Sequence, residues 1–400
     1  MKYHIDMAYK SINQYGEELC GDKVELITTD HSHIMILVDG LGSGVKASIL
    51  SSMTSKILAT MLINGESIDE CIDTVLSTLP YSEEHEAYTS FGVLAVDNSG
   101  RAYLAEFGDL HTLCMRNYKR FDLPRTERTI DGKVIREAHF DVELGDTYAM
   151  ISSGCFISQI DQLSYWSPDQ ALDFIEDCLK KTHASKRLAN QIVQESCDYY
   201  GQESENDLTA AVFRVRNRHI TKLMTGPPSS KDLDEEAVKT FMEGKAFRIV
   251  SGGSTAEIVS RIIGYPVIPI DDPHPDPKIP PMSSIKTIQL VTEGVITLSR
   301  VVELLEEYIK REELDEKSNG KHEESDEEFY LELDKKNGAS LIASRLIENC
   351  TDFDMIIGQA INPAYQDANL SFDLAARKQL CTRIEELMIK LGKKVTTKYY

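Results

Sequence analysis

Residues 35–47 read MILVDGLGSGVKA, and this stretch decides how the N-terminal half of the chain folds. An apolar run ends at Asp39, and glycines follow at positions 40, 42 and 44. One interpretation is a tight turn with an acid at its rim. The other is a carboxylate that holds a cation beside a bare backbone that an anion can approach. A lone Asp-Gly pair is usually a turn, so spacing alone favours neither.

The pattern around this stretch predicts the architecture of the first half. Apolar alternation and helical periodicity predict two strands, two helices, a strand-rich section, two more helices and a last strand. They cover residues 24–28, 33–38, 45–63, 66–79, 90–153, 167–181, 185–201 and 208–215. Long helices beside antiparallel strands indicate a layered α+β domain.

Composition sets limits on the class of protein. A chain of 400 residues exceeds one ordinary core, so two domains are expected. The net charge of -22 argues against a nucleic-acid partner. Eight cysteines without a CxxC pair argue against structural zinc and for free thiols. No signal-peptide or membrane-spanning run is visible, so we expect a cytoplasmic protein without a membrane partner; its oligomeric state stays open.

The pattern changes beyond residue 216. Residues 217–232 contain a Gly-Pro-Pro run and are expected to be a linker. Strand–loop–helix units follow, which predicts a smaller α/β domain over residues 233–400. The highly charged segment 312–328 is expected to form a disordered acidic insertion in that domain.

A glycine pair in this second domain is a candidate anion site. It follows an apolar strand and opens a helix, so its backbone N–H groups are placed to cradle a phosphate or another anion. The segment lacks the lysine of a P-loop, and a simple helix cap by a hydroxyl explains it as well. The residues concerned are Gly252, Gly253, Ser254 and Thr255.

Two carboxylates are expected to meet in the first domain. Asp22 lies just before the strand that pairs with the strand ending at Asp39. In a hairpin the start of one strand lies beside the end of the next, so the two acids share a sheet edge. Two carboxylates and the carbonyl of Gly40 supply the oxygen ligands that Mg²⁺ or Mn²⁺ prefers. A metal there activates water and orients a phosphoryl group.

Four motifs resemble a known family. They are YGEELCGD, VDGLGSGVKA, GDTYAMISSG and ENDLTAAVFRV, which start at residues 15, 38, 145 and 205. Their order and spacing resemble the PPM (protein phosphatase 2C-like) family over residues 1–216, in particular the bacterial stage II sporulation protein E branch. The resemblance implies an α-β-β-α sandwich with Mn²⁺ or Mg²⁺ between the sheets. It also implies hydrolysis of phosphoserine or phosphothreonine in a partner protein by metal-activated water.

The resemblance assigns roles to individual residues. Asp39 bridges two metals and Gly40 gives its carbonyl to one of them. Asp22 binds the second metal directly or through water. Glu17 or Glu18 holds a water in the outer shell. Asp22 and Asp39 are therefore the expected catalytic residues.

Two positions depart from the family pattern. Ser153 and Asn206 stand where relatives carry metal-binding aspartates. Asp207 is adjacent to Asn206, but on a strand its side chain is expected on the opposite face. Losing two anionic ligands weakens binding of hard cations, so weakened binding of one or two Mn²⁺ or Mg²⁺ ions is expected. The sequence thus supports a serine/threonine phosphatase of impaired activity, with a catalytically silent regulatory or binding module as the alternative.

Overall fold

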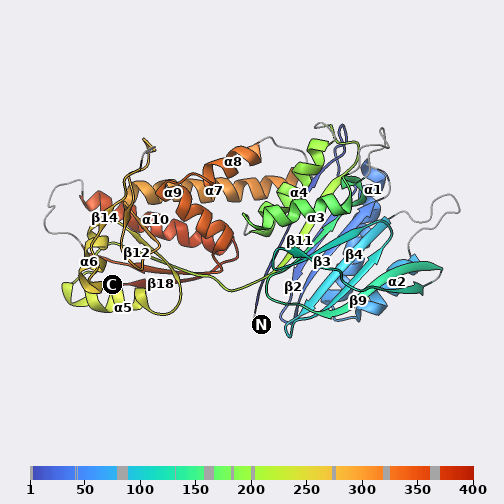
Figure 1. Cartoon of the computed structure of the whole chain (residues 1–400), viewed down its shortest axis with the longest axis horizontal. Helices are drawn as coiled ribbons and strands as arrows, with labels where there is room; N and C mark the ends of the chain where they lie inside the picture. The colour runs from blue at the N-terminus through green and yellow to red at the C-terminus, as the bar shows by residue number, and fades with distance from the viewer. Residues whose placement is uncertain are drawn as a thin grey trace. The chain divides into compact units, whose positions relative to one another are not determined.

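The chain divides into two compact units in the computed structural model. The first contains Met1–Asn217, and the second contains Arg218–Leu314 and Glu323–Tyr400. In Figure 1 the first runs from blue to green and the second from yellow to red. The structure describes residues 3–40, 42, 44–78, 89–130, 132–156, 166–181, 184–199, 203–272, 276–318, 325–360 and 370–400.

Two antiparallel sheets form the centre of the first unit. One has the order β1 (His4–Ile12), β11 (Leu208–Arg216), β10 (Asp146–Ile151), β6 (His111–Arg116) and β7 (Lys119–Arg120). The other has the order β2 (Lys23–Thr28), β3 (Ser32–Gly40), β4 (Thr89–Asp97), β5 (Arg101–Phe107), β9 (Lys133–Asp141) and β8 (Thr126–Ile130). Buried side chains from both sheets, among them Met35, Leu94, Tyr148 and Phe213, form one core.

Helices cover the outer face of each sheet. Helices α1 (Gly44–Ile63) and α2 (Ile68–Thr78) pack on the β2–β3–β4 side, where Leu58 and Ile72 join its outer core. Helices α3 (Pro168–Leu179) and α4 (Ser185–Tyr199) cover the other sheet, as Figure 1 shows beside β11. The predicted α-β-β-α sandwich is confirmed.

Local sequence explains two of these helices. Helix α3 begins with a capping box, in which Ser167 and Gln170 bond each other's backbone N–H groups, and Pro168 occupies its first position. The buried face of α1 is made mostly of glycine, alanine and hydroxyl side chains, which Leu58 joins in the second half of the helix. Small side chains let α1 pack closely against β3, so the helix begins directly after the glycine-rich turn.

A mainly parallel sheet forms the centre of the second unit. Its parallel strands have the order β16 (Leu290–Thr292), β13 (Phe247–Ser251), β12 (Ile220–Thr225), β17 (Asp352–Ile357) and β18 (Lys394–Tyr399). Strands β15 (Ser283–Ser284) and β14 (Ile268–Pro269) extend it in antiparallel fashion.

Helices lie on both faces of this sheet, as expected for parallel strands. Helices α5 (Asp234–Met242) and α6 (Gly253–Ile263) cover one face. Helices α7 (Val295–Ser318), α8 (Ser325–Leu333), α9 (Gly338–Ser344) and α10 (Leu370–Lys390) cover the other face. A short π-helix at Arg345–Asn349 precedes β17. No helix among the described residues has the length and apolar character needed to cross a membrane.

The structure corrects two predictions for this unit. The linker predicted over residues 217–232 is wrong, because Ile220–Thr225 forms β12, which pairs with β13 and β17. The basic and Gly-Pro-Pro residues flanking this short apolar strand concealed it. The disordered insertion predicted over 312–328 is wrong for residues 312–318, which continue α7, and for 325–328, which begin α8. Residues 319–324 lie outside the described residues.

Candidate active site of the first unit

The β2–β3 hairpin places Asp22 and Asp39 opposite each other. Lys23 pairs with Val38 at the end of the hairpin. In the same register, the residues one position further out on each strand are Asp22 and Asp39, which therefore face each other. The glycines beside them let the backbones approach closely. A Cβ on Gly40 would lie 2.8 Å from the carbonyl oxygens of both Gly21 and Ala47. Any side chain at position 40 would therefore force the hairpin and α1 apart.

The Asp22 carboxylate is buried without full hydrogen bonding. Asp22 is only 3% exposed, and its Oδ2 atom has no hydrogen-bond partner. Burial and the negative charges of Asp39 and Asp207 raise the pKa of Asp22 well above its ordinary value. A buried acceptor without a partner is costly, so this oxygen is a candidate donor to a cation.

Asp39 is oriented by the segment that follows β10. Ser153 donates its backbone N–H and its hydroxyl to the same Asp39 oxygen, Oδ2, at 2.8 and 2.7 Å. Burial raises the pKa of Asp39, and these two hydrogen bonds oppose that increase. Ser153 is thus in direct contact with Asp39.

Asp207 fixes the loop that carries Asp22. Its two carboxylate oxygens accept the N–H groups of Gln14 and Gly21, each at 2.9 Å. Burial raises the pKa of Asp207, and these two hydrogen bonds lower it. Asn206 packs against Gly154, where an added Cβ would lie 2.9 Å from Asn206 Cβ. Asn206 therefore lies beside the segment that carries Ser153.

The two glutamates expected in the outer shell are exposed. Glu17 lies at the beginning of α1, since a Cβ on Gly44 would be 2.6 Å from its Oε2 atom. A carboxylate is favourable at a helix N-terminus. No described contact brings Glu18 to the aspartate pair.

One acidic residue near this site was missed in the sequence. The exposed Asp109 follows β5, and its N–H donates to Ser90 Oγ at 3.2 Å, while Ser90 pairs with Asp39 across β3 and β4. Its negative charge raises the pKa of Asp39 after the larger effects of burial and Ser153 are counted. The signal was the Gly-Asp pair of FGDLH at 107–111, which follows an apolar strand as Asp39 does.

A buried ionic cluster holds the turn that carries Asp109. Arg136 donates to the carbonyl oxygens of Gly108 and Leu110 at 3.2 and 3.1 Å. Buried Glu106 accepts the Thr112 N–H at 2.9 Å and pairs with Arg125 at 2.5 Å. These groups line a small cavity of about 210 Å³. The turn is therefore fixed by charged side chains on β5 and β9 and in the segment after β7.

Comparison with known proteins identifies the first unit. Residues 29–216 match the family model described as stage II sporulation protein E (SpoIIE). Residues 29–216 belong to the SpoIIE family. The PPM-type classification predicted from the four motifs is confirmed. No curated protein sequence matches the chain.

Solved structures of SpoIIE and related phosphatases are distant in sequence. The phosphatase domain of SpoIIE from Bacillus subtilis with a fragment of its regulatory domain is 19% identical, with a TM-score of 0.46. The match covers 54% of this chain and 62% of that one. The RsbU and RsbW domains of Rv1364c from Mycobacterium tuberculosis are 15% identical with a TM-score of 0.44, covering 60% of this chain and 69% of that one.

The set of oxygen donors around Asp22 and Asp39 is small among the described residues. Among the described residues, no group of three His, Cys, Asp or Glu side chains is arranged to hold a metal ion. The hairpin carries the carboxylates of Asp22 and Asp39 beside the backbone of Gly40, and one buried oxygen of Asp22 has no hydrogen-bond partner. Oxygen donors of this kind fit one hard divalent cation completed by waters.

The glycine pair of the second unit lies outside the SpoIIE match. Gly252, with φ of 113°, precedes α6 and provides no side-chain cap. A Cβ on Gly253 would meet no atom within 4 Å, so the space beside the helix start is open. Thr255 Oγ1 does not cap the helix, because it accepts the Gly226 N–H at 2.8 Å. The described part of the chain shows neither Ser254 nor Thr255 capping α6.

Proposed function

We propose that this chain is a metal-dependent serine/threonine protein phosphatase of reduced activity. The observation that supports it most is the opposed pair Asp22 and Asp39, with a buried Asp22 oxygen that lacks a partner. A plain turn does not require a carboxylate buried beside a second one whose charge raises its pKa. Membership of residues 29–216 in the SpoIIE family supports the same reaction class.

Asp22, Asp39 and the carbonyl of Gly40 would hold one Mn²⁺ or Mg²⁺ ion. When bound, such an ion supplies a Lewis acid for the phosphoryl oxygens and lowers the pKa of water. In its absence, a proton held between the two carboxylates relieves their repulsion. Ser153 orients Asp39, and Asp207 holds the loop of Asp22 through Gly21.

The substrate would approach from the Asp39 side. Asp39 is partly exposed, whereas Asp22 is buried beneath it. The exposed Asp109 lies beside this opening and is placed to accept a proton or hold a water. The substrate proposed is a phosphoserine or phosphothreonine in a partner protein.

Hydrolysis of p-nitrophenyl phosphate and of a phosphoserine peptide with Mn²⁺ tests this function. We expect Asp39→Asn to lower kcat by about 100-fold, because it removes charge where the transition state is stabilised. The control is Asp30→Asn, an exposed acid in the turn between β2 and β3. Equal rates for the native protein and Asp39→Asn would refute a catalytic site here.

A catalytically silent PPM-fold module is the second candidate. Ser153 and Asn206 favour it, together with the lack of a three-acid metal group in the described residues. Calorimetric titration with Mn²⁺ distinguishes the two. Binding below millimolar concentration that Asp39→Asn abolishes supports the enzyme, and no binding in that range supports the module.

A further inference from the structure

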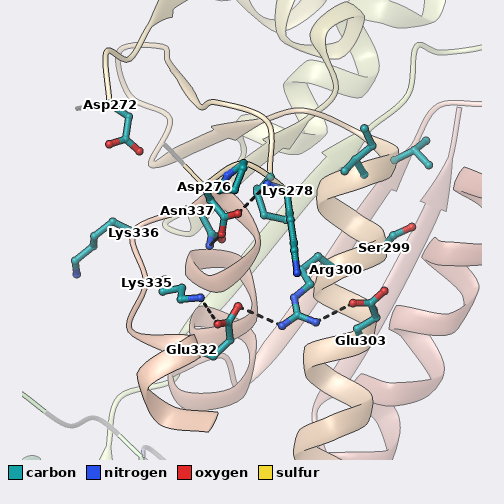
Figure 2. A pocket seen from close by; sticks show the side chains of 14 residues that line it. Asp272, Asp276, Lys278, Ser299, Arg300, Glu303, Glu332, Lys335, Lys336 and Asn337 are labelled. Atoms are coloured by element: carbon teal, nitrogen blue, oxygen red, sulfur yellow. Dashed lines mark hydrogen bonds and ion pairs between the residues drawn. The ribbon is translucent and has the colours of Figure 1, made fainter. Parts of the chain in front are cut away.

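We propose that the second unit binds a small organic anion in the cavity drawn in Figure 2. The cavity has a volume of about 1080 Å³, which is ample for a small molecule since ligand sites measure roughly 300–1000 Å³. Its walls are the first turns of α7, the end of α8, the loop before α9 and the segment 276–279. The SpoIIE match ends before this unit begins.

Hydrogen bonds between its walls preform the cavity. Asn337 donates to Asp276 Oδ2 at 3.0 Å, and its own Oδ1 accepts the Ser340 N–H at the start of α9. Asp276 Oδ1 accepts the Lys278 N–H at 2.9 Å. Because these bonds join the segment 276–279 to α9, the cavity does not need a ligand to take shape.

The charges of the lining are balanced in number, with four acidic and four basic side chains. Their pairing is uneven. Arg300 bonds Glu303 at 2.8 Å and Glu332 at 3.2 Å, and Lys335 bonds Glu332 at 2.5 Å. Burial raises the pKa of Glu332, but the bonds from Lys335 and Arg300 bring it below its ordinary value. Both carboxylates therefore already have cationic partners.

Lys278 and Lys336 are the cations of the lining that remain available among the described residues. Figure 2 shows the Lys278 side chain extending toward the guanidinium of Arg300, and both residues line the same cavity. No carboxylate among the described residues pairs with the Lys278 or Lys336 ammonium groups. Within the described part of the chain, Lys278 thus has no acidic partner beside the Arg300 guanidinium, and a bound anion would supply one. The position between Lys278 and Arg300 is thus the proposed anion subsite.

An apolar wall adjoins this subsite. Ile279 is buried in the core beneath the cavity, while Ile296 in the first turn of α7 is 54% exposed. Val295 and Pro277 extend the same wall. A phosphate or carboxylate attached to an apolar body matches both features, because the charged group meets the cations and the body covers the aliphatic surface.

The test uses the full chain in EDTA and calorimetry with phenylphosphonate, which carries an anion and an apolar ring and has no ester bond to hydrolyse. Lys278→Glu should weaken its binding by at least about tenfold, since a charge-assisted hydrogen bond contributes that much. The matched control is Lys310→Glu, an exposed lysine on α7 outside the cavity, which should bind as the native chain does. Far-UV circular dichroism verifies that both variants fold.

Phenylacetate in parallel distinguishes a carboxylate ligand from a phosphate ligand, and benzyl alcohol should not bind. No binding of either anion, or equal binding by native protein and Lys278→Glu, would overturn the proposal. Binding lost in Asp39→Asn but retained in Lys278→Glu would overturn it too, because the probe would then occupy the first unit. The outcome does not depend on phosphatase activity.

Discussion

Ser153 donates two hydrogen bonds to one oxygen of Asp39, from its backbone N–H and from its hydroxyl. A neutral side chain therefore contacts the aspartate that we propose as a ligand of the cation. Predictions about charge are the sharpest tests of this arrangement.

Asp22→Asn should stabilise the protein in the absence of divalent cations. The substitution removes one of the charges that burial and neighbouring acids disfavour, and each pKa unit of such a shift corresponds to about 1.4 kcal/mol. A rise in the thermal midpoint in EDTA is the measurement. Asp30→Asn is the exposed control and should leave the midpoint unchanged; an equal response of both variants would contradict the argument.

Gly40→Ala should destabilise the first unit. An added Cβ would lie 2.8 Å from two backbone oxygens, which cannot move as a side chain can. Overpacking of this kind costs about 1–3 kcal/mol. Urea unfolding measures the loss. Gly253→Ala is the matched control, because its Cβ enters open space, and a similar loss in that variant would show that the geometry at Gly40 is not the cause.

Glu137→Gln should reduce stability at neutral pH and matter less in acid. Burial raises the pKa of Glu137, but Arg128, at 2.8 Å, and Tyr103, at 2.5 Å, lower it below its ordinary value of 4.5. A depressed carboxyl pKa contributes stability above the unfolded value, and this contribution is lost as pH falls through the folded value.

The expected loss for Glu137→Gln at pH 7 is about 2 kcal/mol, the range for hydrogen bonds to charged groups. Denaturant midpoints at pH 7 and below pH 4 provide the comparison. Asp73→Asn, which removes an exposed partner of the same arginine, should change stability by less than about 0.5 kcal/mol. A loss for Glu137→Gln that is independent of pH would show that packing, not charge, is responsible.

The hydrophobic pattern of the sequence was sufficient to predict most helices and strands of the first unit, because these elements are long and regular. The hairpin logic placed Asp22 beside Asp39 because register depends only on neighbouring strands. The sequence did not reveal the contact of Ser153 with Asp39, which joins residues 114 positions apart through two sheets. Asp109 was missed for the same reason, since its approach to Asp39 depends on β4 lying between them.

In the second unit, the hydrophobic pattern failed to predict a short strand and the ends of two helices. Strand β12 has six residues and begins beside charged side chains, so composition concealed it. The acidic segment 312–328 appeared too charged to fold. Its two ends nevertheless belong to helices α7 and α8, whose apolar faces are buried in the core at Leu305 and Phe329. Packing of a helix face outweighs local charge in such cases.

Restoring carboxylates at both substituted positions tests the charge deficit directly. Ser153→Asp with Asn206→Asp should tighten Mn²⁺ binding and speed hydrolysis of phosphate esters, because hard cations bind more tightly as anionic ligands are added. We expect a gain of at least about tenfold in affinity, since Coulomb terms in a partly buried site exceed those at a surface. Without metal the double variant should be less stable, because the new carboxylate at position 153 would face Asp39 where a hydroxyl now donates to it.

Calorimetry and thermal melts in EDTA and in Mn²⁺ measure both effects. Ser153→Asp alone should show part of each gain, and Ser153→Asn serves as the uncharged control. A double variant that neither binds Mn²⁺ more tightly nor hydrolyses phosphate esters faster than the native chain would contradict this argument. In that case the side chains at positions 153 and 206 do not contact the cation, and the protein has the fold of these phosphatases but not their catalytic activity.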